Sequence, residues 1–337
     1  MPPSVFDSAA REVLGDYPTA RAHLGVLHLG NRGGFSGARL WRAESIHGPV
    51  CLRAWPSDAM SYTQLHEIHR LMQSATQAGL RFVPALLRTR DGDTSVNHLG
   101  RLWEVSSWMP GKADFHSEPR PARLEAACTA LALLHLVWAG TSHGQEQCPA
   151  VRRRLECLEE WMGLVRSGWQ PPYSASHDSV RICTQRAWRL LHERIDQVCV
   201  WLSDWIDRRF VLQPCLCDVW HDHILFEGDT VSGLVDFGAA KIDHVANDLA
   251  RLLGSLVGDD TDARAIGVRA YARVRPLSPE EERLVHVLDV TAAVLGLANW
   301  LMWLYRDGKA FEDENAVARR MTELIRRVEH WPAWRPP

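Results

Sequence analysis

The chain has 337 residues, of which 46% are hydrophobic and 23% are charged, and its formal net charge at pH 7 is −3. A chain of this length can bury enough apolar surface for two domains or two lobes. The small negative charge, without any basic run, argues against a protein whose main task is to bind nucleic acid.

The apolar segments and the N-terminus do not predict a membrane protein. Residues 1–7 lack the basic segment and apolar stretch of a signal peptide. The longest apolar run, near 285–305, is interrupted by His286, Asp289 and Asn299, so it predicts a buried helix rather than a membrane span. Eight scattered cysteines are typical of free thiols in a reducing compartment. We therefore expect a cytoplasmic protein without a membrane partner, and we predict no oligomeric state.

The first third of the chain is predicted to be rich in strands. A short apolar segment at 24–29 precedes a turn-rich loop at 31–37, and apolar residues at helical spacing predict one helix over 62–78, which Gly79 ends. Alternating apolar and polar residues predict strands at 38–44, 50–55, 82–87 and 102–107.

Beyond a hinge near 104–111 the pattern becomes mainly helical. Amphipathic spacing predicts helices at 123–137, 152–166 and 180–207 and over most of 247–330, whereas 209–236 returns to short strands. The fold class is therefore α+β. We expect a small lobe with an antiparallel sheet at 1–108 and a larger, mainly helical lobe at 109–337.

Two aspartates flank a predicted β-hairpin. The strands are 224–226 and 231–235, and 227–230 is the turn between them. Because residue 227 lies midway between Asp218 and Asp236, antiparallel pairing brings both carboxylates toward the same end of the hairpin. Two such carboxylates suit phosphoryl transfer from a nucleotide, in which one holds a metal ion and the other orients the acceptor hydroxyl and takes its proton. Aspartates are also common as turn and capping residues, which is the alternative interpretation.

The block 216–251 resembles the aminoglycoside phosphotransferase and choline kinase-like superfamily, which has a bilobal protein-kinase-like fold. The signature of that superfamily is His-Gly-Asp, four variable residues, Asn, and a hairpin ending in Asp before Phe/Leu-Gly. Asp218 falls on the catalytic Asp, and Asp236-Phe237-Gly238 falls on the metal-binding motif. Asn247-Asp248-Leu249-Ala250-Arg251 is similar to the stretch that starts the next helix, where Asp248 is expected to be a cap or a hydrogen-bonding partner.

The resemblance implies an enzyme that moves the γ-phosphoryl group of ATP or GTP to a hydroxyl of a small molecule, with Mg²⁺ or Mn²⁺ as the metal ion. Asp236 and His223 would be the metal ligands, with Asp222 or His221 as an alternative to His223. His223 stands where the superfamily has Asn, and imidazole suits Mn²⁺ or Zn²⁺ better than Mg²⁺. Leu216-Cys217 also replaces His-Gly. These two departures keep open a second hypothesis, a catalytically impaired kinase-like protein that binds a nucleotide or another ligand.

The resemblance also assigns nucleotide-binding residues in the first lobe. The glycine-rich loop would cover the phosphates, and Arg53 replaces the usual strand Lys and grips phosphate with two donors. Glu67, on the following helix, is expected to pair with Arg53, and the backbone of Glu104–Ser106 to meet the adenine ring. The predicted nucleotide-binding residues are Gly33, Gly34, Ser36, Arg53, Glu67, Glu104 and Ser106.

The acceptor is expected to bind the C-terminal helices. In the superfamily it is an alcohol on an amino sugar, choline, homoserine or a similar metabolite. A Trp face can hold a cationic amine, although a Trp stripe on a helix is also typical of a core. The candidate acceptor residues are Asp289, Asn299, Trp300 and Trp303.

A cysteine and histidine cluster next to the hairpin suggests a zinc site as another alternative. Cys215, Cys217, His221 and His223 form Cys-x-Cys-x3-His-x-His. That spacing matches no usual structural zinc pattern, and the hairpin accounts for the residues better.

Overall fold

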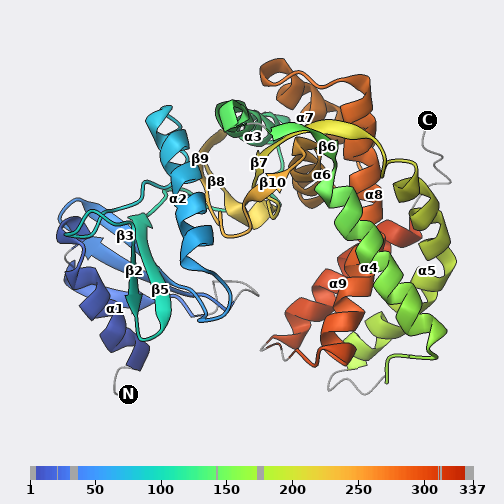
Figure 1. Cartoon of the computed structure of the whole chain (residues 1–337), viewed down its shortest axis with the longest axis horizontal. Helices are drawn as coiled ribbons and strands as arrows, with labels where there is room; N and C mark the ends of the chain where they lie inside the picture. Colours follow the sequence, from blue (N-terminus) through green and yellow to red (C-terminus); the bar gives the residue numbers. More distant parts are fainter. Residues whose placement is uncertain are drawn as a thin grey trace. The chain divides into compact units, whose positions relative to one another are not determined.

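The computed structural model describes residues 5–20, 22–30, 37–141, 143–172, 178–309, 311 and 313–330. The chain forms two compact units (Figure 1). The first unit is Met1–Gly140 with Trp220–Lys241, and the second is Thr141–Val219 with Ile242–Pro337. An antiparallel sheet in the first unit and a mainly helical second unit confirm the predicted α+β class.

The first unit is built on a five-stranded antiparallel sheet with the order β1-β2-β3-β5-β4. The strands are β1 (Ala22–His28), β2 (Arg39–Ser45), β3 (Gly48–Ala54), β4 (Ser95–His98) and β5 (Arg101–Ser107). Three of the four predicted strands are confirmed as β2, β3 and β5.

The strand predicted at 82–87 is wrong. This segment makes only an isolated bridge between Leu86 and Ser106, and β4 pairs with β5 instead. Pro84 interrupts the segment, and a proline has no N–H group to donate to a ladder.

The two faces of the sheet are covered by different helices (Figure 1). Helix α1 (Val5–Gly15), followed by the turn η1 (Pro18–Ala20), packs on the face formed by Trp41, Leu52 and Trp103. Alternate residues of a strand point to opposite faces. The opposite face therefore carries Arg53 and Glu104, and helix α2 (Tyr62–Gln77) lies against it.

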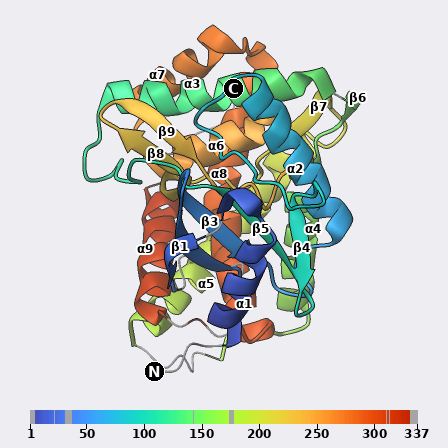
Figure 2. The ribbon, with the colours of Figure 1, turned by 90° about the vertical axis from the view of Figure 1, so that its left-hand side faces the viewer.

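The predicted hairpin is present in the first unit as β8 (Ile224–Glu227) and β9 (Thr230–Leu234), preceded by the turn η4 (His221–His223). Helix α3 (Pro121–Trp138) lies alongside β9 (Figure 2). Arg123 of α3 is buried, and its Nε donates to the carbonyl of Gly228 at 2.8 Å. This contact fixes the hairpin turn against the helix.

The second unit combines a short sheet with long helices. The sheet order is β10-β7-β6, formed by β6 (His143–Gln147), β7 (Arg209–Cys215) and β10 (Lys241–Asp243). Helix α8 contacts α4, α5, α6 and α9 (Figure 1). The remaining elements are η3 (Ala139–Thr141), α4 (Pro149–Arg166), α5 (Asp178–Ser203), α6 (Val245–Leu256), α7 (Thr261–Val274), α8 (Pro279–Leu301), the π-helical turn η5 (Met302–Arg306) and α9 (Glu314–Glu329).

Two helical segments are long and apolar enough to cross a membrane by length and composition alone: Pro121–Thr141 and Pro279–Arg306. In the structure 72% of the apolar window of the second segment is buried, as is half of the first. Core helices of globular proteins have this character, which agrees with the prediction of a buried helix near 285–305.

Candidate active site

In the first unit, Asp236 lies between Arg53 and His223. Nη1 of Arg53 donates to Oδ1 of Asp236 at 3.0 Å, and Nε2 of His223 lies 3.6 Å from Oδ2. The guanidinium of Arg53 also stacks on the ring of Trp55, 4.8 Å from its centroid. Residues from β3, the turn η4 and the segment after β9 thus meet at one site.

The backbone around Asp236 has an unusual geometry. Asp236 has a φ of +66°, a left-handed conformation that Asp tolerates better than most residues and that clusters at functional sites. A Cβ at Gly238 would collide with the ring of Trp55. The glycine of Asp-Phe-Gly is therefore needed because the chain passes directly over Trp55.

The charges around Asp236 keep it ionised. Burial alone would raise the pKa of Asp236, but the positive charge of Arg53, the neighbouring His223 and the hydrogen bond from Arg53 together lower it. Burial would likewise lower the pKa of Arg53, and the charges of Asp236 and Glu104 raise it instead. The site therefore offers a carboxylate oxygen and an imidazole nitrogen as neighbouring ligand atoms for a metal ion, with a guanidinium beside them.

The expected pair of Arg53 with Glu67 is not the one formed. Glu67 is exposed, and its carboxylate contacts Arg70 at 3.1 Å on its own helix. Arg53 instead contacts Glu104, with 3.7 Å between Nε and Oε1. The helical pattern predicted the apolar face of α2 correctly, but the residue of α2 that bonds Glu104 is His69, at 2.6 Å.

The structure places Glu104–Ser106, the residues expected to meet the adenine ring, in the middle of the sheet. These residues lie inside β5, where Glu104 and Ser106 pair with Arg53 and Cys51 of β3. On the other side of the strand, the carbonyl of Val105 accepts from the N–H of Leu87. Sheet pairing takes up backbone groups that a base would otherwise use, and the adenine contact at these residues stays a prediction. The other predicted phosphate contacts, Gly33, Gly34 and Ser36, lie outside the described residues.

In the second unit, Asp218 lies on a loop that Asp248 fixes. The N–H groups of Leu216 and Cys217 donate to the carboxylate of Asp248 at 2.6 and 2.7 Å. Asp248 is fully buried on α6. It is thus the hydrogen-bonding partner that the sequence predicted.

Asp218 itself forms an ion pair with Arg251, three residues after Asp248 on α6. Helix α6 therefore contacts this loop twice, through the backbone before Asp218 and through the side chain of Asp218. Arg251 was not predicted from the sequence, because a cation in a helical pattern is usually solvated.

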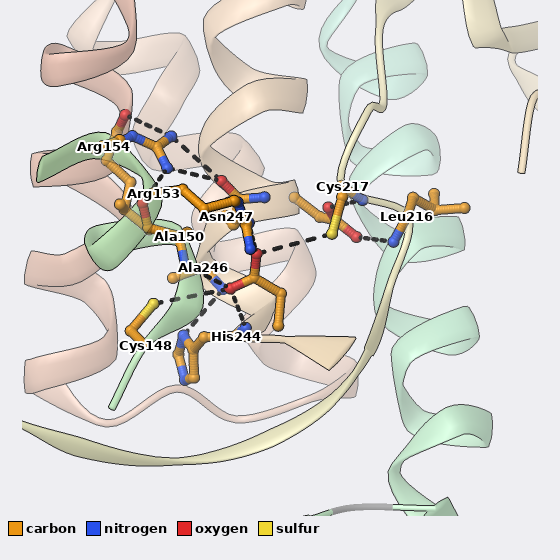
Figure 3. Close-up of polar contacts among 12 residues, drawn as sticks. Cys148, Ala150, Arg153, Arg154, Leu216, Cys217, His244, Ala246 and Asn247 are labelled. Atoms are coloured by element: carbon orange, nitrogen blue, oxygen red, sulfur yellow. Dashed lines mark hydrogen bonds and ion pairs between the residues drawn. The ribbon is translucent and has the colours of Figure 1, made fainter. Parts of the chain in front are cut away.

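A second buried carboxylate, Asp243, connects the loop to helix α4. It accepts hydrogen bonds from the N–H groups of Ala150 and His244, at 3.1 and 2.8 Å, and from Arg153. The thiols of Cys148 and Cys217 also donate to it, at 3.9 and 3.8 Å. Figure 3 shows these side chains and the neighbouring pair of Arg154 and Asn247, whose closest atoms are 3.2 Å apart. No motif in the sequence marks Asp243, because its partners are far apart in the chain.

The candidate acceptor residues of α8 and η5 differ in their burial and in their contacts. Asp289 is buried, and it pairs with Arg264 and Arg327 at 2.8 and 2.9 Å. This structural pairing argues against a role in binding the acceptor.

The two tryptophans and Asn299 differ in burial. Trp300 is buried and packs on Trp303 and Phe311, which is a core position. Asn299 and Trp303 are half-buried. The amide oxygen of Asn299 accepts from the thiol of Cys157 at 3.3 Å, and the ammonium of Lys309 lies 4.6 Å above the Trp303 ring.

Comparisons with known proteins agree with this fold and with the 216–251 block. The homoserine kinase of Nitrobacter winogradskyi is 28% identical over 217 residues, which make up 63% of this chain and 60% of that protein. The chain thus spans about three fifths of the length of this relative.

Solved structures share the fold at low sequence identity. An aminoglycoside phosphotransferase from Alicyclobacillus acidocaldarius has a TM-score of 0.63 and 15% identity, covering 96% of this chain and 93% of that one. An amicoumacin kinase in complex with AMP-PNP and Ca²⁺ has a TM-score of 0.64 and 14% identity, covering 96% and 92%.

The sequence pattern of a whole family decides the assignment. The sequence model of the phosphotransferase enzyme family matches residues 29–285. This range is well over half of the chain and includes Arg53, Asp218, Asp236 and Asp248. The chain therefore belongs to the phosphotransferase enzyme family.

Proposed function

We propose that this protein transfers the γ-phosphoryl group of ATP or GTP to a hydroxyl group of a small molecule. The observation that carries the proposal is that Arg53 and His223 both contact the carboxylate of Asp236, in a chain that belongs to this family. A carboxylate and an imidazole whose ligand atoms are 3.6 Å apart fit a shared divalent cation.

The nucleotide side of the reaction falls to the first unit. Arg53 binds phosphate oxygens through its paired N–H donors. Asp236 and His223 would hold the cation, which neutralises phosphate charge when bound. Because one ligand is an imidazole, Mn²⁺ is expected to support the reaction better than Mg²⁺.

The acceptor side falls to Asp218. Its carboxylate orients the acceptor hydroxyl and takes the proton as the acceptor oxygen bonds to the γ-phosphorus and the bond from that phosphorus to the nucleoside diphosphate breaks. Arg251 holds the carboxylate, and Asp248 holds the loop before it. Homoserine is the first acceptor to test, since the relatives are homoserine kinases. Among the residues predicted to contact the acceptor, we retain Asn299 and Trp303.

The test separates nucleotide binding from turnover. Nucleotide affinity is measured by calorimetry with Mg²⁺ and with Mn²⁺, and turnover is measured with homoserine, choline, 3-aminopropanol and an aminoglycoside. We expect Asp236→Ala to abolish metal-dependent binding. Asp218→Asn should retain binding and lose about 100-fold or more in turnover, the usual contribution of a general base. A wild type that binds no nucleotide with either metal would overturn the proposal.

The second hypothesis from the sequence, an impaired kinase-like binding protein, is favoured by one observation. The ion pair with Arg251 engages the carboxylate that would serve as base. Tight metal-dependent binding of nucleotide without phosphorylation of any acceptor in the panel would support this alternative.

A further inference from the structure

A continuous series of buried and half-buried polar side chains runs through the first unit from Thr94 to Asp236. The hydroxyl of Thr94, which precedes β4, lies 2.6 Å from Nδ1 of His69, and Nε2 of His69 lies 2.6 Å from Oε2 of Glu104. The other oxygen of Glu104 lies 3.7 Å from Nε of Arg53, whose Nη1 bonds Asp236.

Glu104 is placed by strand register. It stands directly opposite Arg53 in the pairing of β3 with β5, so the two side chains share one face of the sheet. Only 13% of its side chain is exposed. Burial alone would raise the pKa of Glu104, but the hydrogen bond from His69 and the charge of Arg53 lower it, so the group is anionic. Burying a carboxylate costs free energy that an apolar residue at this position would not.

His69 is fixed on both of its ring nitrogens. It lies on the sheet-facing side of α2, and its side chain is 2% exposed. With Thr94 at Nδ1, Nε2 is directed at Glu104, and the imidazole therefore connects helix α2 to β5. No other described residue of α2 has a charged contact with Arg53 or Glu104.

The orientation of the Arg53 guanidinium is set by its contacts with Asp236, Glu104 and the ring of Trp55. Asp236 is the proposed metal ligand, so its contact with Arg53 would change when a metal ion and a nucleotide bind. Glu104 and Trp55 would then be the groups that hold the guanidinium in place. A long, flexible side chain held this way loses less conformational entropy when it binds phosphate.

We propose that Glu104 and His69 are positioning residues for Arg53, which orient its guanidinium toward the phosphates of the nucleotide and couple that orientation to helix α2. The inference rests on the proposed function. It assigns to a strand carboxylate and a helix imidazole the role that the sequence resemblance gave to Glu67.

The test compares a ligand that has phosphates with one that lacks them. Affinities for metal–ATP and for adenosine are measured for wild type, Glu104→Gln and a matched control, Glu44→Gln. Glu44 lies on β2 of the same sheet and pairs with Arg42, but it is about half exposed. We expect Glu104→Gln to weaken ATP binding about tenfold or more, equivalent to about 1.4 kcal/mol, and to leave adenosine binding within about twofold. Glu44→Gln should change neither affinity.

Two further variants keep the inference falsifiable if Glu104→Gln folds poorly. His69→Gln retains an N–H donor for Glu104 and should bind ATP nearly as wild type, whereas His69→Leu should weaken ATP binding and spare adenosine. In an Arg53→Ala background, Glu104→Gln should have no further effect on ATP affinity, because Glu104 acts through Arg53.

The outcomes distinguish this inference from the proposed function. If wild type binds metal–ATP but Glu104→Gln binds it equally well, or loses ATP and adenosine binding alike, the positioning role is wrong and the proposed function stands. If wild type binds no nucleotide with either metal, both are overturned.

Discussion

Cys217 occupies a position that suits glycine. It has a φ of +62°, whereas the superfamily signature has Gly directly before the catalytic Asp. The left-handed region costs an L-residue about 1 kcal/mol or more relative to Gly. The hydrogen bonds to Asp248 and the thiol contact with Asp243 hold the residue there.

This strain predicts an inverted order of stability for two variants. An Ala is normally more stable than a Gly by up to about 1 kcal/mol, because Gly gains more entropy on unfolding. At Cys217 both variants lose the thiol, but only Ala keeps the strain. We therefore expect Cys217→Gly to be at least as stable as Cys217→Ala in urea unfolding. An Ala variant more stable than the Gly variant by about 1 kcal/mol would show that the loop relaxes.

Asp248 provides a prediction that separates turnover from nucleotide binding. Asp248→Asn would leave one of the two N–H groups, of Leu216 and Cys217, without a good acceptor, which costs about 1–2 kcal/mol of unfolding free energy. The loop that carries Asp218 should lose its fixed geometry. We expect kcat to fall at least about tenfold and the affinity for metal–nucleotide to stay unchanged, because Arg53 and Asp236 belong to the other unit.

Asp260 is the matched control for Asp248. It accepts from the N–H of Ala263 as the cap of α7 in the same unit. Asp260→Ala should lower the free energy of unfolding by about 1 kcal/mol and leave kcat unchanged. An equal loss of kcat in both variants would mean that kcat simply follows stability.

At the scale of elements, local patterns predicted the hairpin and helix α2 well. Both depend on short-range signals: the Gly-Asp turn between two apolar strands, and apolar side chains at helical spacing. The contacts of Arg53 depend instead on the register of β3 with β5 and on the rotation of α2. A shift of one residue in register would turn Glu104 to the other face, and no local pattern fixes that register.

The interface of α7, α8 and α9 contains a pH-sensitive group. His286 on α8 is half-buried, and its pKa is lowered to about 4 by loss of solvation and by the charge of Arg264, although Asp289 opposes the shift. The unfolded state binds a proton near pH 6.5, well before the folded state does. The stability due to neutral His286 is therefore complete above about pH 6.5 and is lost as the pH falls toward 4.

Urea unfolding at pH 7 and pH 5 tests this assignment. We expect wild type to lose about 1–2 kcal/mol more than His286→Gln between these two pH values. The difference between the proteins isolates His286 from other groups that titrate in the same range. Equal losses in both would show that His286 titrates normally in the folded state.

At the scale of the whole molecule, the sequence predicted the fold class because one specific block identified a superfamily. The same block predicted roles for Asp218 and Asp236, which stay predictions, and a hydrogen-bonding role for Asp248, which is confirmed. The residues that contact the acceptor were harder to predict. In the sequence, a carboxylate such as Asp289 that pairs with two arginines cannot be told from one that binds a ligand. The charged partners of Asp289 come from α7 and α9, and only the packing of three helices identifies them.

The division into two units predicts that nucleotide and acceptor functions are separable. The described contacts of Glu104 lie in the first unit, and the loop contacts of Asp248 lie in the second. Changes at independent sites add in free energy within about 0.5 kcal/mol. The losses in kcat/KM from Glu104→Gln and Asp248→Asn should therefore multiply in the double variant. Steady-state kinetics of the four proteins measure this, and a departure of more than about fivefold from the product would show that Arg53 and the Asp218 loop are energetically coupled.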